Sequence, residues 1–364
     1  MKLIHCADMH LDSKLNANLD KQKAKERKHE ILNTFIRMVD YARDNGVRAI
    51  LICGDLFDTH NISALSKNTI HNLVVNNGNI GFYYLRGNHD DVEALDIFDE
   101  IPDNFHLFND IWTSYKLGEK TYLYGVELNS DNSASVQHSF APDPSLINIV
   151  MLHGQESEAK PGDKTEIIGL KEFRNKGIDY LALGHVHEYK SAMLDGNCKY
   201  CYSGCLEGRG FDETGKHGFV LLDIDEDLGK VSDTFVPFSY RNLWDVNVDI
   251  SSCLSTPEII GEVRMALNAS PATCDDLVKV ILSGNVDVSC EKDIDFIKRT
   301  FEDEYYFIKV YDKTVTRVNP EEFMLDCSLK GEFVRTVLGD DSLSQEEKGK
   351  IVKLGLSVLL GGEI

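Results

Sequence analysis

Short apolar segments in the first half of this chain are each followed directly by aspartate, asparagine or histidine. The polar stretches, in order, are Ala7-Asp8-Met9-His10, Gly54-Asp55-Leu56-Phe57-Asp58, Gly87-Asn88-His89-Asp90, His153-Gly154 and Gly184-His185-Val186-His187. In a layered α/β fold, the loops at the carboxyl ends of the strands open into one crevice. We therefore expect these stretches to assemble a single site at one edge of a sheet.

The segments around the first three stretches alternate between strand and helix. Strands are predicted at Lys2–Cys6, Arg48–Cys53 and Ile80–Leu85, and helices at Lys25–Asn45 and Ala64–Asn77. This β-α-β-α-β order predicts parallel strands joined by right-handed crossovers.

From Phe105 onward the pattern changes to short strands with little helix between them. These strands are predicted at Tyr122–Val126, Leu146–Leu152, Tyr180–Leu183, Tyr200–Ser203 and Phe219–Asp223. The expected fold class is α/β, with a layered two-sheet core over residues 1–240.

Beyond Tyr240 the pattern starts again. Strands and helices alternate over residues 241–315, which predicts a small α+β domain. Residues 316–364 predict a helical tail, because Pro320 follows the capping residue Asn319 and Ser344 forms a capping box with Glu347. The apolar side chains of the tail fit either core packing or the docking of a partner helix.

Composition places the chain among ordinary globular proteins, with 42% hydrophobic and 27% charged residues. No apolar stretch is long enough to span a bilayer, the first residues fit a strand rather than a signal peptide, and the nine cysteines lack a disulfide spacing. These features predict a cytoplasmic protein with reduced thiols and no membrane partner. The net charge of −22 disfavours nucleic-acid binding unless positive charge is local or comes from metal or a partner chain.

The residue types in the polar stretches predict a metal centre. Imidazole and carboxylate together suit manganese, iron or zinc, whereas magnesium and calcium sites are built mainly of oxygen. The expected ligands are Asp8, His10, Asp55, Asn88, His153, His185 and His187. Seven ligands are too many for one ion and suffice for two, held roughly 3.5–4 Å apart, with Asp55 as the expected bridge.

Two further residues are expected to act beside the metal. Asp58 is expected to orient a ligand by hydrogen bonding. His89 follows Asn88 but points the other way along the loop, where it can donate a proton to a leaving oxygen or stabilise transition-state charge. The other histidines are expected to be structural or surface residues, with His60 the one nearest the site; they are His5, His29, His60, His71, His106, His138 and His217.

The ordered set D-x-H, GDxxD, GNHD, H-G and GHxH resembles the calcineurin-like metallophosphoesterase superfamily. The resemblance implies that His89 is the catalytic histidine and that Asp55 is shared between two ligand groups. The first group is Asp8, His10, Asp55 and His187, and the second is Asp55, Asn88, His153 and His185.

Details of the motifs distinguish between branches of this superfamily. Protein phosphatases of this superfamily carry arginine directly after GDxxD and GNHE in place of GNHD, whereas Thr59 and Asp90 stand at these positions here. The stretch Tyr202–Lys216 is similar to the Y-x-G…E…F-x-E…K-G segment of SbcD-type DNA repair nucleases, as is the domain layout. A glycine usually follows the D-x-H-L stretch in such nucleases, where Asp12 stands here.

This similarity implies a metal-dependent DNA exonuclease or endonuclease in double-strand-break repair and recombination. It implies two divalent ions, with manganese ahead of iron and zinc, and a homodimer that binds DNA and an SbcC-type coiled-coil ATPase. It also implies that residues 241–315 cap the site and recognise DNA, and that residues 316–364 are a candidate segment for docking the ATPase.

The strongest basic cluster opens the helix that follows the Asp8 loop. Lys21, Lys23 and Lys25, together with Arg209, are the candidate contacts to a phosphate backbone. The lysines fit a solvated helix face equally well.

Three functions stay open from the sequence. A DNA nuclease is favoured by the second domain and the tail, since a small substrate needs neither. A phosphodiesterase or phosphatase for a small phosphorylated molecule is favoured by the acidic charge. A scaffold that holds an ATPase on DNA without cleaving is disfavoured by the complete ligand set and His89.

Overall fold

The computed structural model describes residues 1–13, 15, 19–58, 62–90, 98, 100–129, 131–157, 167–196, 198–288 and 290–359. His60 therefore lies outside the described residues. The chain divides into two compact units, Met1–Asn242 and Leu243–Ile364. Each unit has a hydrophobic core of its own.

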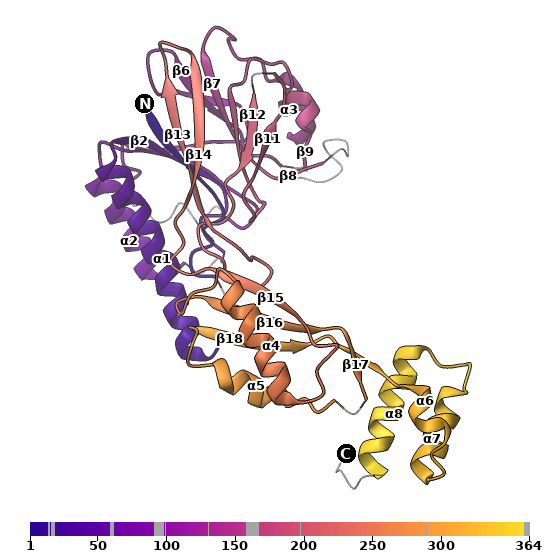
Figure 1. Ribbon diagram of the computed structural model, residues 1–364. Helices are drawn as coiled ribbons and strands as arrows, with labels where there is room; N and C mark the ends of the chain where they lie inside the picture. The colour runs from indigo at the N-terminus through magenta and orange to yellow at the C-terminus, as the bar shows by residue number, and fades with distance from the viewer. Residues whose placement is uncertain are drawn as a thin grey trace. The chain divides into compact units, whose positions relative to one another are not determined.

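The first unit is built on two six-stranded sheets (Figure 1). The first sheet has the order β14-β13-β1-β2-β3-β4, in which β1 to β4 are parallel. Its strands are β1 (Lys2–Cys6), β2 (Val47–Cys53), β3 (Gly81–Leu85), β4 (Phe105–Leu107), β13 (Gly218–Asp225) and β14 (Lys230–Pro237).

The second sheet has the order β11-β12-β10-β7-β6-β5, in which β6, β7, β10 and β12 are parallel. Its strands are β5 (Thr113–Lys116), β6 (Thr121–Gly125), β7 (Ile147–His153), β10 (Tyr180–Gly184), β11 (Lys190–Met193) and β12 (Lys199–Tyr202). A short parallel pair, β8 (Gln155–Glu156) and β9 (Ile167–Ile168), follows β7.

Helices cover the outer faces of both sheets. The helices α1 (Lys21–Asp44) and α2 (Ala64–Asn76) pack their apolar faces on the first sheet. The helix α3 (Ser133–Ser139) and the 3-10 helix η2 (Leu170–Phe173) pack on the second. Between the sheets lies a core to which both contribute, with Leu51 from one and Met151 from the other. This arrangement confirms the expected layered two-sheet α/β fold.

Local contacts explain where the structure differs from the sequence prediction. The helix α1 begins at Lys21 rather than Lys25, because Asp20 accepts hydrogen bonds from the backbone N–H groups of Gln22 and Lys23 at 2.9 and 2.8 Å. The strand β14 was not predicted, because its side chains are exposed or half-buried and Asp233 interrupts the apolar positions Val231 and Phe235. It is held by pairing with β13 along its whole length.

The second unit contains a parallel sheet with helices packed on it. The sheet consists of β15 (Leu243–Asp249), β16 (Leu277–Ser283) and β18 (Phe307–Asp312), and the helices are α4 (Thr256–Ala269) and α5 (Ile294–Phe301). A short parallel pair, β17 (Asn285–Asp287) and β19 (Val315–Arg317), was not predicted.

The helical tail has a small core of its own. It comprises α6 (Pro320–Met324), α7 (Leu329–Leu338) and α8 (Gln345–Leu359), packed through Val334 and Val352. By its contacts the tail belongs to the same compact unit as β15–β18, and its separation at residue 316 stays a prediction. Among the described helices, none combines the length and the apolar character needed to cross a membrane.

Candidate metal centre

The loops that carry the expected ligands meet at the carboxyl ends of strands from both sheets. The strands β1, β2 and β3 carry them in the first sheet, and β7 and β10 carry them in the second. The structure brings all the expected ligands together: Asp8, His10, Asp55, Asn88, His153, His185 and His187. Ligands that are up to 177 residues apart in the chain thus share one site.

His10 and His187 point the same ring nitrogen at each other, with 3.1 Å between their Nε2 atoms. Each ring uses its Nδ1 elsewhere: His10 contacts Asp58 Oδ1 at 3.0 Å, and His187 contacts Glu213 Oε1 at 2.7 Å. An ionised carboxylate only accepts hydrogen bonds, so both Nδ1 atoms carry a proton, and in the neutral form of each ring the Nε2 lone pair faces inward. Two facing lone pairs repel each other, and a shared cation is the partner that fits them.

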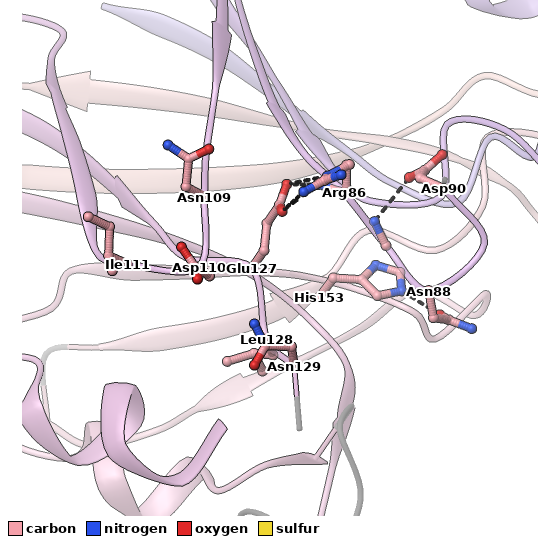
Figure 2. A pocket seen from close by; sticks show the side chains of 11 residues that line it. Arg86, Asn88, Asp90, Asn109, Asp110, Ile111, Glu127, Leu128, Asn129 and His153 are labelled. Atoms are coloured by element: carbon pink, nitrogen blue, oxygen red, sulfur yellow. Dashed lines mark hydrogen bonds and ion pairs between the residues drawn. The ribbon is translucent and has the colours of Figure 1, made fainter. Parts of the chain in front are cut away.

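A second set of donors lies around Asn88. Its Oδ1 is 2.9 Å from His153 Nε2 and 3.2 Å from His185 Nδ1, and Figure 2 shows the His153 ring turned toward it. His153 donates from Nδ1 to the backbone carbonyl of Cys53 at 2.9 Å. Burial lowers the pKa of His153 to about 4, so its ring stays neutral and its Nε2 lone pair is free for a metal.

Asp55 lies between the two groups of donors. Its Oδ2 is 3.7 Å from His10 Nε2 and 3.5 Å from His153 Nε2. Asp8 is also buried here, and both of its carboxylate oxygens accept the backbone N–H of His185 at 3.0 Å. Burial, and next the charge of Asp55, raise the pKa of Asp8. Two buried carboxylates in contact with neutral imidazoles need positive charge, which a pair of divalent cations would supply.

The backbone at the site adopts conformations that side chains usually avoid. Four expected ligands have positive φ: Asp8 (+54°), His10 (+45°), Asp55 (+51°) and His185 (+99°). Such residues cost on the order of 1–3 kcal/mol each and occur mainly at functional sites. The loops also approach closely: a Cβ on Gly54, which has φ +90°, would overlap the His153 ring, and one on Gly87 would overlap the Asp55 carboxylate.

Asp58 and His89 form the exposed side of this cluster. Asp58 Oδ1 is 3.0 Å from His10 Nδ1 and 3.3 Å from His89 Nδ1. Burial would raise the pKa of Asp58, but the hydrogen bonds from the two histidines outweigh it and lower that pKa. The hydrogen bond to Asp58 raises the pKa of His89, whose side chain is 47% exposed. A protonatable imidazole therefore lies at the opening of the site.

Residues 1–189 match the family model described as calcineurin-like phosphoesterase, which is more than half of the chain. The chain belongs to the calcineurin-like phosphoesterase family. This agrees with the expectation from the ordered motifs. The chemistry of this family is phosphoester hydrolysis at a dimetal centre.

Similarity to individual proteins is moderate. The chain is 28% identical over 264 residues to the DNA double-strand break repair protein Mre11 of Sulfolobus acidocaldarius, which covers 68% of this chain and 67% of that protein. It is 27% identical to the uncharacterized metallophosphoesterase YhaO of Bacillus subtilis, with 62% of this chain and 57% of that protein covered. A dimetal phosphatase from Danio rerio aligns at 13% identity and a TM-score of 0.41, with 65% of this chain and 99% of that one covered.

The residues predicted to contact the substrate lie in two different parts of the first unit. Arg209 lies at the centre, but its Nε and Nη2 donate to Glu213 at 3.1 and 2.7 Å, and its Nη1 is 3.5 Å from Asp58. The lysines predicted to contact DNA lie in the first two turns of α1, where Lys21 and Lys25 are exposed and Lys23 is half-buried. Their role in binding DNA stays a prediction.

Sequence reasoning assigned no role to two carboxylates that support the site. Glu213 accepts from His187, as described above, and lies in the segment after β12. Asp90 accepts the backbone N–H groups of Leu56, Phe57 and Gly87 at 3.2, 2.9 and 3.0 Å, and so ties the Asp55 loop to the Asn88 loop. Burial raises the pKa of Asp90 to about 6. The sequence signal for Asp90 was its position as the acidic residue at the end of the GNHD motif.

A third carboxylate, Glu207, connects the same segment to α1. It is fully buried and accepts from Arg27 Nη2 at 3.0 Å and from Thr34 Oγ1 at 2.7 Å. Arg27 also donates to Glu30 at 2.7 Å. The first glutamate of the Tyr202–Lys216 stretch therefore anchors the segment that carries Arg209 and Glu213.

Proposed function

We propose that this phosphoesterase is a metal-dependent DNA nuclease of the SbcD type, which hydrolyses phosphodiester bonds at DNA ends during double-strand-break repair. The convergence of the histidine Nε2 atoms and buried carboxylates, with His89 exposed beside them, carries the proposal. The similarity to an archaeal Mre11 supports DNA as the substrate. The chain spans 67% of the length of that Mre11 protein and 57% of the length of YhaO, so the activity of the whole protein is part of the proposal.

The donor set supports two divalent ions, with manganese ahead of iron and zinc. Asp8, His10, Asp55 and His187 would hold one ion, and Asp55, Asn88, His153 and His185 the other. Such a pair of ions activates water and neutralises charge on a phosphate during in-line displacement.

The protein's own side chains orient the reacting groups. Asp58 holds the His10 ring through Nδ1 and also contacts His89. His89, exposed at the opening, donates a proton to the leaving oxygen of the phosphodiester or stabilises its developing charge. Glu213 fixes the His187 ring in the same way that Asp58 fixes His10.

An exposed apolar surface on the helical tail supports the proposal that this chain binds an SbcC-type ATPase. An apolar groove runs between α7 and α8, lined by Leu329, Phe333, Ile351, Leu354 and Val358. Most of these side chains are exposed, including Leu329 at 72%. A groove of this kind accepts the apolar face of a helix, which suits one helix of a coiled coil. We also propose a homodimer, on the SbcD-type resemblance alone.

The acidic charge favours a second function, hydrolysis of a small phosphodiester. The chain has a net charge of −22, which opposes a DNA backbone away from the metal centre. In that case the described lysines of α1 would be a solvated helix face.

The deciding assay compares three substrates: linear duplex DNA, hairpin DNA and a nitrophenyl phosphodiester. The full chain is incubated with manganese, with and without the ATPase partner, and Asp55→Asn serves as the inactive control. We expect cleavage of DNA and of the small ester by the unmodified chain. Cleavage of the small ester alone, even with the ATPase present, would overturn the nuclease proposal. Failure to cleave any of the three would support the scaffold function.

A further inference from the structure

An open pocket of about 690 Å³ lies beside the metal centre in the first unit (Figure 2). Its volume lies within the range of roughly 300–1,000 Å³ in which proteins bind small molecules. Asn88 and His153 line its end at the metal centre. Its other lining residues follow β3, β4 and β6, among them Arg86, Asn109, Asp110, Glu127 and Asn129. In the view of Figure 2, Asn109, Asp110 and Ile111 lie across the Glu127 carboxylate from His153.

The charges that line this pocket do not favour a phosphate. The Arg86 guanidinium is positively charged, and the Glu127 carboxylate neutralises that charge. Arg86 Nε is 2.9 and 3.0 Å from the two carboxylate oxygens of Glu127, and Arg86 Nη2 is 2.5 Å from Glu127 Oε2. The carboxylates of Asp110 and Asp90 add negative charge to the lining. A group bound here next to a phosphate at the metal centre is therefore preferably neutral.

The remaining lining residues suit a flat heterocycle. Ile111 and Leu128 offer apolar surface, and Ile111 is 66% exposed. The amides of Asn109 and Asn129 can donate hydrogen bonds, and Asp110 can accept them. The Asn129 amide is oriented, because its Oδ1 accepts the backbone N–H groups of Asp131 and Asn132 at 2.9 and 3.0 Å. Nucleobases combine apolar faces with edges that carry both donors and acceptors.

We propose that this pocket, the nucleoside pocket, binds the sugar and base of the nucleotide whose phosphate lies at the metal centre. The inference rests on the proposed function and deepens it, because it names the part of the substrate that the pocket selects.

The test uses the manganese-loaded full chain and the variants Asn109→Ala and Asp110→Ala. Deoxyadenosine binding is measured by calorimetry, a readout that does not depend on turnover. Steady-state kinetics then compare the nitrophenyl ester of deoxyadenosine 5′-phosphate with bis(nitrophenyl) phosphate, which has no nucleoside. Asp103→Ala is the matched control, because Asp103 is an exposed aspartate before β4, at the end of that strand opposite Asp110.

We expect deoxyadenosine affinity, and the ratio of kcat/KM for the nucleoside ester to that for the simple ester, to fall about tenfold in both variants, as expected for one lost hydrogen bond to the base. Asp103→Ala should change neither quantity. Unchanged affinity and an unchanged ratio in both variants, with DNA still cleaved, would overturn the nucleoside pocket but not the nuclease. The expected losses in a chain that cleaves no DNA would support the pocket and overturn the nuclease.

Discussion

His187 donates a hydrogen bond from Nδ1 to Glu213 at 2.7 Å, and this contact joins the metal centre to the segment after β12. Glu213 also accepts from Arg209 Nη2 at 2.7 Å. Burial would raise the pKa of Glu213, but the hydrogen bonds from His187 and Arg209 outweigh it and lower that pKa. The carboxylate therefore stays ionised, holds the proton of His187 on Nδ1 and leaves Nε2 as the ligand atom.

Glu213→Gln should weaken metal binding about 10–100-fold, because the amide is a poorer acceptor and no longer enforces the His187 tautomer. Calorimetric titration of the chelator-treated protein with manganese measures this affinity. Asp212→Asn is the matched control, since Asp212 is the exposed neighbour of Glu213. Equal manganese affinity in the two variants would remove Glu213 from this role.

His89→Ala should lower kcat by a factor of about 10²–10⁴, the usual range for general acid–base catalysis, while the metal content stays the same. If His89 protonates the leaving oxygen, the loss should be larger for DNA, whose leaving group is a basic alkoxide, than for a nitrophenyl ester. Elemental analysis and paired kinetics on the two substrates measure both quantities. An equal loss on both would assign His89 to charge stabilisation instead of proton donation.

Arg27→Met should destabilise the first unit by about 3–5 kcal/mol, because it leaves the Glu207 charge buried without its partner. Urea unfolding is followed by Trp112 fluorescence in a Trp244→Phe background, since the chain has only these two tryptophans and they lie in different units. The control is Arg43→Met on the same helix, where the side chain is 50% exposed in its ion pairs with Asp40 and Asp44. The control should cost no more than about 1 kcal/mol.

His5 should make the first unit less stable in acid. Burial lowers the pKa of His5 from 6.5 to about 3, so between these values the unfolded chain binds a proton that the folded chain does not. The free energy of unfolding should therefore fall as the pH falls below 6.5, with a contribution from His5 of about 2 kcal/mol at pH 5.

Replacing His5 with Asn should remove this part of the pH dependence, whatever it costs at neutral pH. Unfolding is compared at pH 7.5 and pH 5 in chelator, with His138→Asn as the control because the His138 side chain is 86% exposed. The same pH dependence in the unmodified chain and in His5→Asn would contradict the prediction.

Reversing the charge of Lys21, Lys23 and Lys25 should weaken DNA binding and make its salt dependence less steep. If each lysine contacts one phosphate, the slope of log K against log salt should decrease in magnitude by about three units. Binding to a labelled duplex at several salt concentrations gives this slope. The control reverses Lys2, Lys116 and Lys230, which lie at the opposite ends of the strands from the metal centre. Equal slopes for the two triple variants would show that the α1 lysines do not contact DNA.

Much of the fold and the ligand set followed from local pattern. The strands β1, β2 and β3 are buried apolar runs that end at polar residues, so both their positions and the convergence of Asp8, Asp55 and Asn88 could be predicted. The strand β14 could not, because Asp233 interrupts the apolar alternation of Val231 and Phe235, and pairing with β13 defines the strand. Nor could the start of α1, which depends on the side chain of Asp20.

The sequence by itself determined which residues could bind metal, because residue type and position after a strand depend only on the local chain. Tertiary structure decided how they are used. Asp58, Glu213 and the Cys53 carbonyl fix three histidine rings through Nδ1, and these partners come from other parts of the chain. Glu213 lies 26 residues from His187, and Glu207 lies 180 residues from Arg27. Such contacts depend on how two sheets and a helix pack, which no local pattern records.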